Sequence, residues 1–129
     1  MPFFSILTAV RDGLSFFKET TDTVLSQSFV DFEWIIIDDG SVEPITDFIS
    51  NINDPRIRLI QNKKNTGQTK SLNHGIKLSK ANWIVRVDGD DLLHKKRLEY
   101  SQDCIQSSPR LLPIIISDYN VLLESGVTL

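Results

Sequence analysis

Two short apolar segments of this chain end in clusters of acidic residues, and these clusters are its clearest chemical signal. The run over 83–87, apolar except for Arg86, leads into the sequence DGDD at 88–91, and the apolar run over 34–37 leads into DDGS at 38–41. Carboxylates held so close together repel one another unless a cation neutralises them or some of them stay protonated. A site made of carboxylate oxygens suits the hard cations Mg2+ and Mn2+. The pattern therefore predicts a site for a divalent cation and for the phosphate groups that such a cation binds.

Each acidic cluster also has a simpler interpretation. Residues 88–91 could be a polar turn whose acids favour the positive end of the helix that follows. The Asp-Gly pair within 38–41 is a common turn signal, and Ser41 could cap the next element. If the second cluster instead meets a ligand, its ionised carboxylates would accept hydrogen bonds from N–H or hydroxyl groups.

A third polar segment, NTGQ at 65–68, precedes Lys70 at the start of a predicted helix. Free backbone N–H groups at a helix start can bind an anion, and the lysine could add to that attraction. The alternative is a solvated loop that merely begins the helix. The two histidines, His74 and His94, are expected to serve surface or packing roles.

The elements that must position these residues alternate between strand and helix. Strands are predicted over 4–10, 33–38, 56–61 and 83–87; helices are predicted over 14–26, 45–52, 69–79 and 95–107, with a further extended segment over 112–123. Such alternation predicts an α/β, Rossmann-like fold with a mostly parallel sheet, right-handed crossovers and helices on both faces. Because the carboxyl ends of parallel strands lie along one edge, the two acidic clusters are expected to face one crevice.

Two of the helices carry more detailed expectations. In the helix over 69–79, an apolar face of Leu72, Ile76 and Leu78 is expected to pack on the sheet, with Asn82 as the stop. In the helix over 95–107, Cys104 lies within an amphipathic segment, which predicts a buried, unreactive thiol. A single cysteine also excludes an internal disulfide and fits a reducing compartment.

The composition narrows the class of protein. The 129 residues are 40% hydrophobic and 24% charged, with a net charge of −3, which is ordinary for a soluble domain and argues against a general nucleic-acid surface. No span approaches the roughly 20 apolar residues of a transmembrane helix, and the N-terminus lacks the basic leader of a signal peptide. A cytoplasmic location is therefore expected. The sequence also lacks a nucleophile elbow, zinc-ligand spacing and a phosphate-binding P-loop.

Taken in order, these motifs resemble the N-terminal, nucleotide-binding half of the family 2 glycosyltransferases with the GT-A fold. The resemblance covers nearly the whole chain. It is carried by FSILTAV at 4–10, VLSQSF at 24–29, IDDGS at 37–41, NTG at 65–67 with LNHG at 72–75, and VDGDD at 87–91.

The resemblance assigns expected roles to individual residues. Thr8, Ala9, Val10 and Asp39 would hold the base of a nucleotide, usually uridine, and Asp88 would lie near the ribose. The predicted nucleotide-sugar-binding set is Thr8, Ala9, Val10, Asp39, Asn65, Gly67, Asp88 and Asp90, and the predicted ligands of Mg2+ or Mn2+ are Asp90 and Asp91.

The function that the resemblance implies is metal-dependent binding of a nucleoside-diphosphate sugar, with transfer of the sugar to a hydroxyl acceptor. The acceptor would be a saccharide or a lipid-linked saccharide in cell-surface polysaccharide synthesis, and the whole enzyme could associate with a membrane surface. Residues 1–129 would form a single donor-binding domain that lacks the acceptor-binding part. The general base would lie outside this chain, because nothing in the setting of Asp118 or Glu124 marks either as a base.

Some positions depart from the family pattern. Arg11-Asp12 replaces a frequent Tyr-Asn pair, so the base pocket is expected to differ in detail, and Gln68 and Leu72 stand where many members have Leu and Arg. An alternative from another class is a non-catalytic, receiver-like α/β module that binds Mg2+. Receiver domains place their acidic pair after the first strand, whereas the first strand here ends in Ala9-Val10.

Overall fold

The computed structural model describes residues 1–108, 110 and 114–115 of the chain. The extended segment predicted over 112–123, apart from residues 114 and 115, lies outside the described residues. Asp118 and Glu124, the two acids of the C-terminal segment, also lie outside them.

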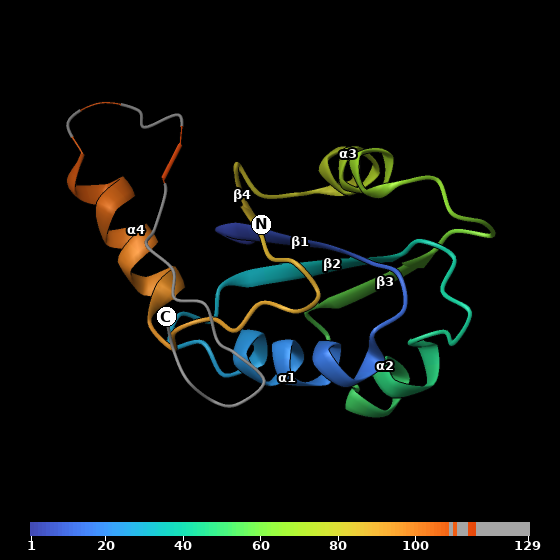
Figure 1. Ribbon diagram of the computed structural model, residues 1–129. Helices are drawn as coiled ribbons and strands as arrows, with labels where there is room; N and C mark the ends of the chain where they lie inside the picture. Colours follow the sequence, from blue (N-terminus) through green and yellow to red (C-terminus); the bar gives the residue numbers. More distant parts are fainter. Residues whose placement is uncertain (109, 111–113, 116–129) are drawn as a thin grey trace, which may run out of the picture.

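The described residues form one four-stranded parallel sheet in the order β3-β2-β1-β4. The strands are β1 (Phe4–Val10), β2 (Phe32–Asp38), β3 (Ile57–Gln61) and β4 (Trp83–Arg86). The helices are α1 (Leu14–Leu25), α2 (Thr46–Ile52), α3 (Gln68–Leu78) and α4 (Arg97–Ser107). The predicted α/β alternation is therefore confirmed, with element ends shifted by one or two residues (Figure 1).

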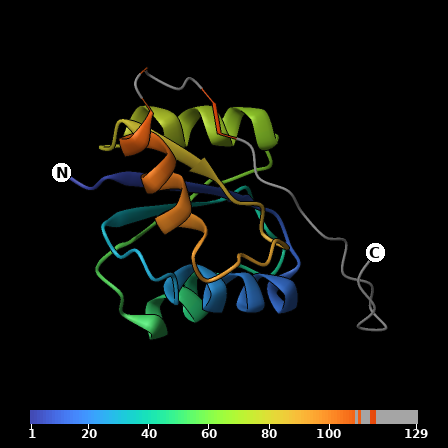
Figure 2. The same cartoon turned by 90° about the vertical axis from the view of Figure 1, so that its left-hand side faces the viewer.

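Helices cover both faces of this sheet. Figure 1 shows α1 and α2 below the strands and α3 above them, and the end-on view of Figure 2 shows the same layers with α4 across the sheet's end. Every residue of β2 is buried, because β2 lies between β1 and β3 and is covered on both faces. Its β-branched run, Ile35 to Ile37, suits such a position.

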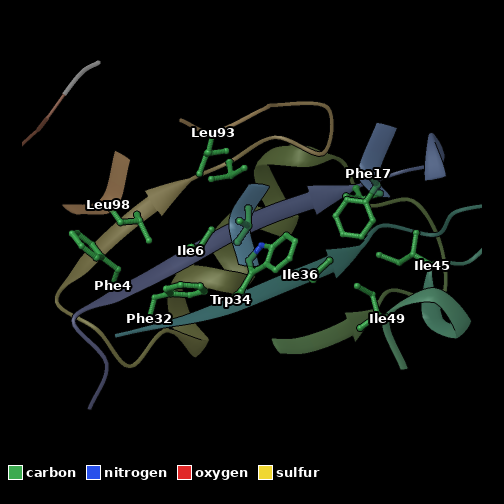
Figure 3. Packing of buried hydrophobic residues seen from close by; sticks show 13 residues of the cluster. Phe4, Ile6, Phe17, Phe32, Trp34, Ile36, Ile45, Ile49, Leu93 and Leu98 are labelled. Carbon is green, nitrogen blue, oxygen red and sulfur yellow. The ribbon is translucent and has the colours of Figure 1, made fainter. Parts of the chain in front are cut away.

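Trp34 of β2 lies at the centre of the larger core cluster (Figure 3). Its indole N–H donates a 3.0 Å hydrogen bond to the hydroxyl of Thr8 on β1, so the buried polar atoms satisfy one another. The ring of Phe17 from α1 packs against Trp34 with 5.8 Å between ring centroids. This face of the sheet is therefore filled by aromatic and branched side chains that fix α1 to the strands.

Helix α3 meets the other face more closely than its sequence predicts. On this face, Leu7, Ile35 and Ile37 form a second, smaller core cluster, and Leu72 and Leu78 of α3 pack against it as expected. The prediction for Ile76 is wrong, because 51% of that residue is exposed. Small residues take the central place: a Cβ atom added to buried Gly75 would lie 3.2 Å from side-chain atoms of Ile37 and of Leu7. Because the helix backbone approaches so closely, even a Cβ atom at this position would require Ile37 and Leu7 to shift.

Two local expectations are corrected. Helix α3 ends at Leu78 rather than near Asn82, because Ser79 is extended with φ −65° and ψ 139°. Cys104 is exposed rather than buried. Helix α4 turns Leu98 and Ile105 toward the core, and Cys104 is rotated away from that face by about a quarter turn, since successive residues differ by about 100°.

The amino end of the sheet is held by buried Glu33, which pairs with the partly exposed Arg58. Glu33 of β2 accepts hydrogen bonds from the Ser5 hydroxyl at 2.6 Å, the Lys80 backbone N–H at 2.6 Å and the Arg58 guanidinium at 3.1 Å. Burial by itself raises the pKa of Glu33, but these donors outweigh it and lower the pKa below its ordinary value of 4.5. The network ties the end of α3 to three strands.

The order of the strands also defines where a ligand can enter. The chain runs outward from β1 to β2 and β3, then returns over the sheet through α3 to place β4 on the other side of β1. The carboxyl ends of β1 and β4 therefore flank a topological switch point, where open α/β sheets form their binding crevices. Within the described part of the chain, no helix has the length and apolar character to cross a membrane.

Candidate functional site

Two adjoining hollows lie at this switch point. The first, of about 320 Å³, is lined by Ala9, Val10, Arg11, Asp39, Asn65, Gly67 and Gln68. The second, of about 380 Å³, is lined by Ala9, Val10, Arg11, Asp12, Gly13, Phe16, Gln68, Asp88, Gly89 and Asp90. The end of β1 and the first residue of α3 thus form a shared wall, with Asp39 on one side and the acidic loop on the other. The expectation that both acidic clusters face one crevice holds for Asp39, Asp88 and Asp90, whereas Asp38 and Asp91 line neither hollow.

Asp39 is the most constrained acid of the site. Its carboxylate is buried and accepts four hydrogen bonds: from the Asn62 amide at 2.8 Å, the Thr66 N–H at 2.9 Å, the Thr66 hydroxyl at 2.8 Å and the Gly67 N–H at 2.8 Å. Burial alone would raise the pKa of Asp39, but these donors hold it far below its ordinary value of 3.8. Asp39 is therefore ionised at neutral pH, and it orders the loop between β3 and α3.

That loop also packs directly on the turn after β2. Gly40 has φ +76°, and a Cβ atom added there would lie 2.8 Å from the backbone nitrogen of Asn65 and from the carbonyl carbon of Lys64. Gly67 adopts φ +94° where the loop enters α3. Such positive φ angles and close backbone contact favour glycine over any residue with a side chain.

The neighbouring acid, Asp38, has a purely local role. Its two carboxylate oxygens accept hydrogen bonds from the N–H of Ser41 at 3.0 Å and from the N–H of Ile45 at 3.4 Å. This is the turn interpretation of the 38–41 cluster, and it holds for Asp38. The adjacent Asp39 points to the other side of the strand end, where it lines the first hollow.

The loops after β1 and β2 are joined by two hydrogen bonds of Asp12 with Ser41 and Val42, which together are called the clasp. The Asp12 carboxylate accepts a 2.8 Å hydrogen bond from the Val42 N–H, and the Asp12 N–H donates to the Ser41 hydroxyl at 2.8 Å. Asp12 adopts φ +61°, a left-handed conformation that costs about 1 kcal/mol for a residue with a Cβ atom. The clasp offsets that cost and fixes the direction of the backbone at Arg11.

The acids of the second hollow differ in how freely they can meet a ligand. Asp88 forms a two-point ion pair with Arg86 at 2.9 and 3.1 Å, and this pair raises the pKa of Arg86. Asp91 accepts the Asp88 N–H at 3.0 Å, which closes the turn. Asp90 is exposed, lines the hollow, and its side chain has no hydrogen-bond partner among the described residues. Asp90 is therefore the acid that is free to bind.

Helix α1 holds this acidic loop from one face. The Leu93 N–H donates to the Thr23 hydroxyl at 3.1 Å. Just beyond the helix, Gln27 donates to the His94 carbonyl at 2.9 Å and accepts from the Leu98 N–H at 3.1 Å. These contacts fasten the loop after Asp91 to the same helix that begins beside the second hollow.

The acidic residues at the second hollow would hold a cation only together with oxygen atoms from a bound ligand and water. Among the described residues, no group of three or more His, Cys, Asp or Glu side chains comes together as metal ligands. Mg2+ is commonly bound through one or two carboxylates, with substrate phosphates and water as its other ligands. The free oxygens of Asp90 suit that arrangement, because they are hard ligands open to the hollow.

The predicted nucleotide-sugar-binding residues divide into two groups. Seven of them line one or both hollows: Ala9, Val10, Asp39, Asn65, Gly67, Asp88 and Asp90. Thr8 lines neither, because its buried hydroxyl accepts the indole N–H of Trp34. Asp91, a predicted metal ligand, also lines neither hollow and serves the turn through Asp88.

Several residues in or beside the hollows have no individual predicted role. Asn62 and Thr66 line neither hollow but hold Asp39. Asn62 carries no sequence signal of its own, since polar residues are ordinary in a loop, and Thr66 is singled out only as part of the polar segment 65–68. Arg11 stands out in the sequence only as a departure from the family pattern, whereas Gln68 also belongs to the polar segment 65–68 that is predicted to face an anion. Phe16 could have been noticed, because it is a large aromatic residue outside the apolar face of its helix and is 55% exposed.

Sequence comparison places the chain in a family. The profile of Glycosyl transferase family 2 matches residues 5–118. EpsE of Bacillus subtilis, which is named as a glycosyltransferase, is 34% identical over 102 residues, covering 76% of this chain and 36% of EpsE. The bifunctional glycosyltransferase pgtA of Dictyostelium discoideum is 34% identical over 113 residues, covering 80% of this chain and 15% of pgtA. The chain belongs to glycosyltransferase family 2.

Solved structures agree on the fold. TarS of S. aureus, in complex with UDP-GlcNAc, aligns with a TM-score of 0.75 at 22% identity, covering 80% of this chain and 31% of that chain. The mannosyltransferase PcManGT of Pyrobaculum calidifontis, in complex with GDP-Man and Mn2+, aligns with a TM-score of 0.75 at 16% identity, covering 84% and 33%. The fold is that of the GT-A glycosyltransferases, and the chain spans about a third of these structures. These matches favour the glycosyltransferase interpretation over the receiver-like alternative.

Proposed function

We propose that this chain is the donor-binding part of a glycosyltransferase and binds a nucleoside-diphosphate sugar across the two hollows. The observation that carries this proposal is their shared wall, which places the buried Asp39 and the free Asp90 on either side of Arg11 and Gln68. One extended ligand with a flat, hydrogen-bonding end and an anionic middle would span both. Two of the structural neighbours were solved with such ligands, UDP-GlcNAc and GDP-Man.

The nucleoside would occupy the first hollow, with uridine as the proposed base. Asp39 orders the loop that carries Asn65 and Gly67, so that loop is shaped before the ligand arrives. Preorganisation of this kind improves affinity by reducing the entropy lost on binding. Ala9 and Val10 would supply the apolar wall beside the base.

The diphosphate would occupy the second hollow, where Asp90 would hold Mg2+ or Mn2+ with Asp91 as the proposed second ligand. When bound, such a cation neutralises the charge that develops on the departing diphosphate. Asp88 would lie toward the ribose, with its direction fixed by Arg86. The supporting observation is the open carboxylate of Asp90, which shares its hollow with the end of β1.

Transfer of the sugar to a hydroxyl group is proposed for the whole enzyme. The acceptor would be a saccharide or a lipid-linked saccharide, in keeping with the proposed role in cell-surface polysaccharide synthesis. Its binding surface and the general base are proposed to lie outside residues 1–129. A cytoplasmic location, with contact to a membrane surface through other segments, remains part of the same proposal.

Isothermal titration with UDP and GDP, each with Mn2+ or with EDTA, tests the proposed function. We expect UDP to bind with Mn2+ and to bind at least tenfold more weakly with EDTA, since a cation held by Asp90 would offset the repulsion between that carboxylate and the diphosphate. Failure of both nucleotides to bind with Mn2+ would contradict a nucleoside-diphosphate site. Tighter binding of GDP than of UDP would contradict only the choice of uridine.

A charge-neutral variant locates the cation. Asp90→Asn should reduce the gain in UDP affinity that Mn2+ provides, while UDP affinity in EDTA should not fall, because one charge that repels the diphosphate is removed. Asp103→Asn is the matched control, because Asp103 is an exposed acid on α4 that lines neither hollow. An equal effect of the two substitutions would show that the gain reflects overall charge rather than a ligand at Asp90.

A further inference from the structure

We infer that Arg11 is a donor-binding residue whose guanidinium group contacts the diphosphate at the boundary between the two hollows. The inference rests on the proposed function and adds a residue to which neither the motifs nor the family resemblance assigns a role. Arg11 directly follows β1 and lines both hollows. A group in that position meets the part of the ligand that crosses from one hollow to the other, which in a nucleoside-diphosphate sugar is the phosphate chain.

The acidic residues around Arg11 would repel a diphosphate, and the guanidinium group would offset that repulsion. Among the residues that line the hollows, Arg11 is the one basic side chain, whereas Asp12, Asp39, Asp88 and Asp90 are acidic. A diphosphate brought between these acids would be repelled by them. A cation at Asp90 would relieve that repulsion on one side of the second hollow, and a guanidinium on the β1 side would relieve it on the other.

The guanidinium group is available for this contact. All three ion pairs of the described residues use other arginines, namely Arg56, Arg58 and Arg86. Arg11 is exposed, and its side chain has no hydrogen-bond partner in the described part of the chain. Its neighbour Asp12 does not compete, because the Asp12 carboxylate accepts the Val42 N–H at 2.8 Å. Arg11 can therefore bind a phosphate without first breaking an ion pair.

The backbone that carries Arg11 is held more firmly than its side chain. The clasp of Asp12 with Ser41 and Val42 fixes the residue that follows Arg11 in a left-handed conformation. On the other side, Val10 lies within the β1 ladder opposite Asp38. A fixed backbone with a free, planar, five-donor side chain is well suited to two-point recognition of phosphate oxygens.

A ligand series identifies which part of the nucleotide Arg11 contacts. Affinities of the wild type, Arg11→Ala and Arg11→Lys for uridine, UMP and UDP are measured by titration calorimetry with Mn2+. Arg11→Ala should weaken UDP binding roughly 10- to 100-fold, which is the range expected for a charge-assisted hydrogen bond. Uridine binding should change by less than about twofold, and Arg11→Lys should give an intermediate loss for UDP. Melting temperatures of the variants should match the wild type, since Arg11 is exposed.

Lys77→Ala is the charge-matched control, because Lys77 is an exposed base on α3 that lines neither hollow. It should leave UDP binding within about twofold of the wild type. If Arg11→Ala weakens uridine as much as UDP, then Arg11 contacts the nucleoside and the inference is wrong. Unchanged UDP binding in Arg11→Ala overturns it as well, while the proposed function stands. A wild type that binds no UDP with Mn2+ overturns both.

Discussion

The hydroxyl of Thr20 on α1 donates a 3.0 Å hydrogen bond to the carbonyl of Gly89, in the middle of the acidic loop. Gly89 separates Asp88 from Asp90, and a Cβ atom added to it would lie 2.8 Å from a methyl group of Val10. The loop is therefore held from below by a helix and from the side by β1. A helix side chain thus holds the loop that carries Asp90 through its hydrogen bond to the residue before it.

Replacing Thr20 tests this relationship. Thr20→Val keeps the branched shape but removes the donor to Gly89, so the acidic loop should become less ordered. We expect the gain in UDP affinity from Mn2+ to fall about fivefold, with unfolding free energy lower by about 1 kcal/mol. Calorimetric titration with Mn2+ and with EDTA, together with urea unfolding, measures both quantities.

Thr21→Val is a closely matched control for that experiment. Thr21 is also buried, but its hydroxyl donates at 2.8 Å to the Phe17 carbonyl within α1. Its replacement should change stability by a similar amount and leave the gain from Mn2+ intact. If both variants reduce that gain equally, Thr20 acts through general stability and not through the loop.

The sequence predicted the sheet well because the strands of this protein have strong local signals. The run Ile35 to Ile37 is continuously apolar, which is typical of a strand buried on both faces, and the turn residues after it are equally clear. The four-stranded alternation then placed both acidic clusters at one edge. Those steps need only periodicity and the geometry of parallel sheets.

The different roles of the acids within each cluster could not be predicted from the sequence. Asp38 and Asp39 are adjacent and chemically identical, yet one closes a turn and the other orders a loop 27 residues away. Their partners are set by tertiary contacts, which leave no periodic trace in the sequence. The prediction that Cys104 is buried was wrong for a different reason. A shift of one residue along a helix turns a side chain by about 100°, which here places it outside the core.

Replacing Asp39 even by the amide of the same shape, asparagine, should disturb the loop that it orders. In Asp39→Asn, the new NH2 group would replace an oxygen that now accepts from Gly67 or Thr66, so one donor would face another. We expect a loss of about 3 kcal/mol in unfolding free energy and weaker uridine binding even in EDTA. Asp22→Asn, on the exposed side of α1, should change neither. Uridine affinity equal to that of the wild type would remove the ordered loop from the nucleoside site.

Two glycines with nearly equal φ angles allow the cost of backbone strain to be measured apart from the cost of steric contact with a neighbouring loop. Gly13 and Gly40 have φ of +74° and +76°, but an added Cβ atom meets nothing within 4 Å at Gly13 and lies 2.8 Å from backbone atoms at Gly40. Gly13→Ala should therefore cost about 1 kcal/mol of unfolding free energy, and Gly40→Ala about 3 kcal/mol. Urea unfolding measures both. Equal losses would mean that loop 64–65 moves away without cost, and nucleoside affinity of Gly40→Ala should then fall, because Asn65 lines the first hollow.

The Glu33 network predicts a dependence of stability on pH. The pKa of Glu33 is lower in the folded protein than its ordinary value of 4.5, because donors from Ser5, Lys80 and Arg58 outweigh the effect of burial. A lowered folded-state pKa means that the unfolded chain binds the proton more readily. The stabilisation from Glu33 is therefore complete above about pH 5 and declines as the pH falls through the folded-state pKa.

Glu33→Gln tests that dependence. At pH 7 we expect its unfolding free energy to be lower than that of the wild type by about 2 kcal/mol, because Gln brings donors to a site already filled by donors. The difference should shrink between pH 5 and pH 3, where the wild type loses the same interaction. Asp54→Asn is the comparison, because Asp54 pairs with Arg56 two residues away in a partly exposed ion pair, so its loss should stay below about 1 kcal/mol. A difference for Glu33→Gln that stays constant from pH 7 to pH 3 would show that the carboxylate charge contributes nothing and that the effect comes from packing alone.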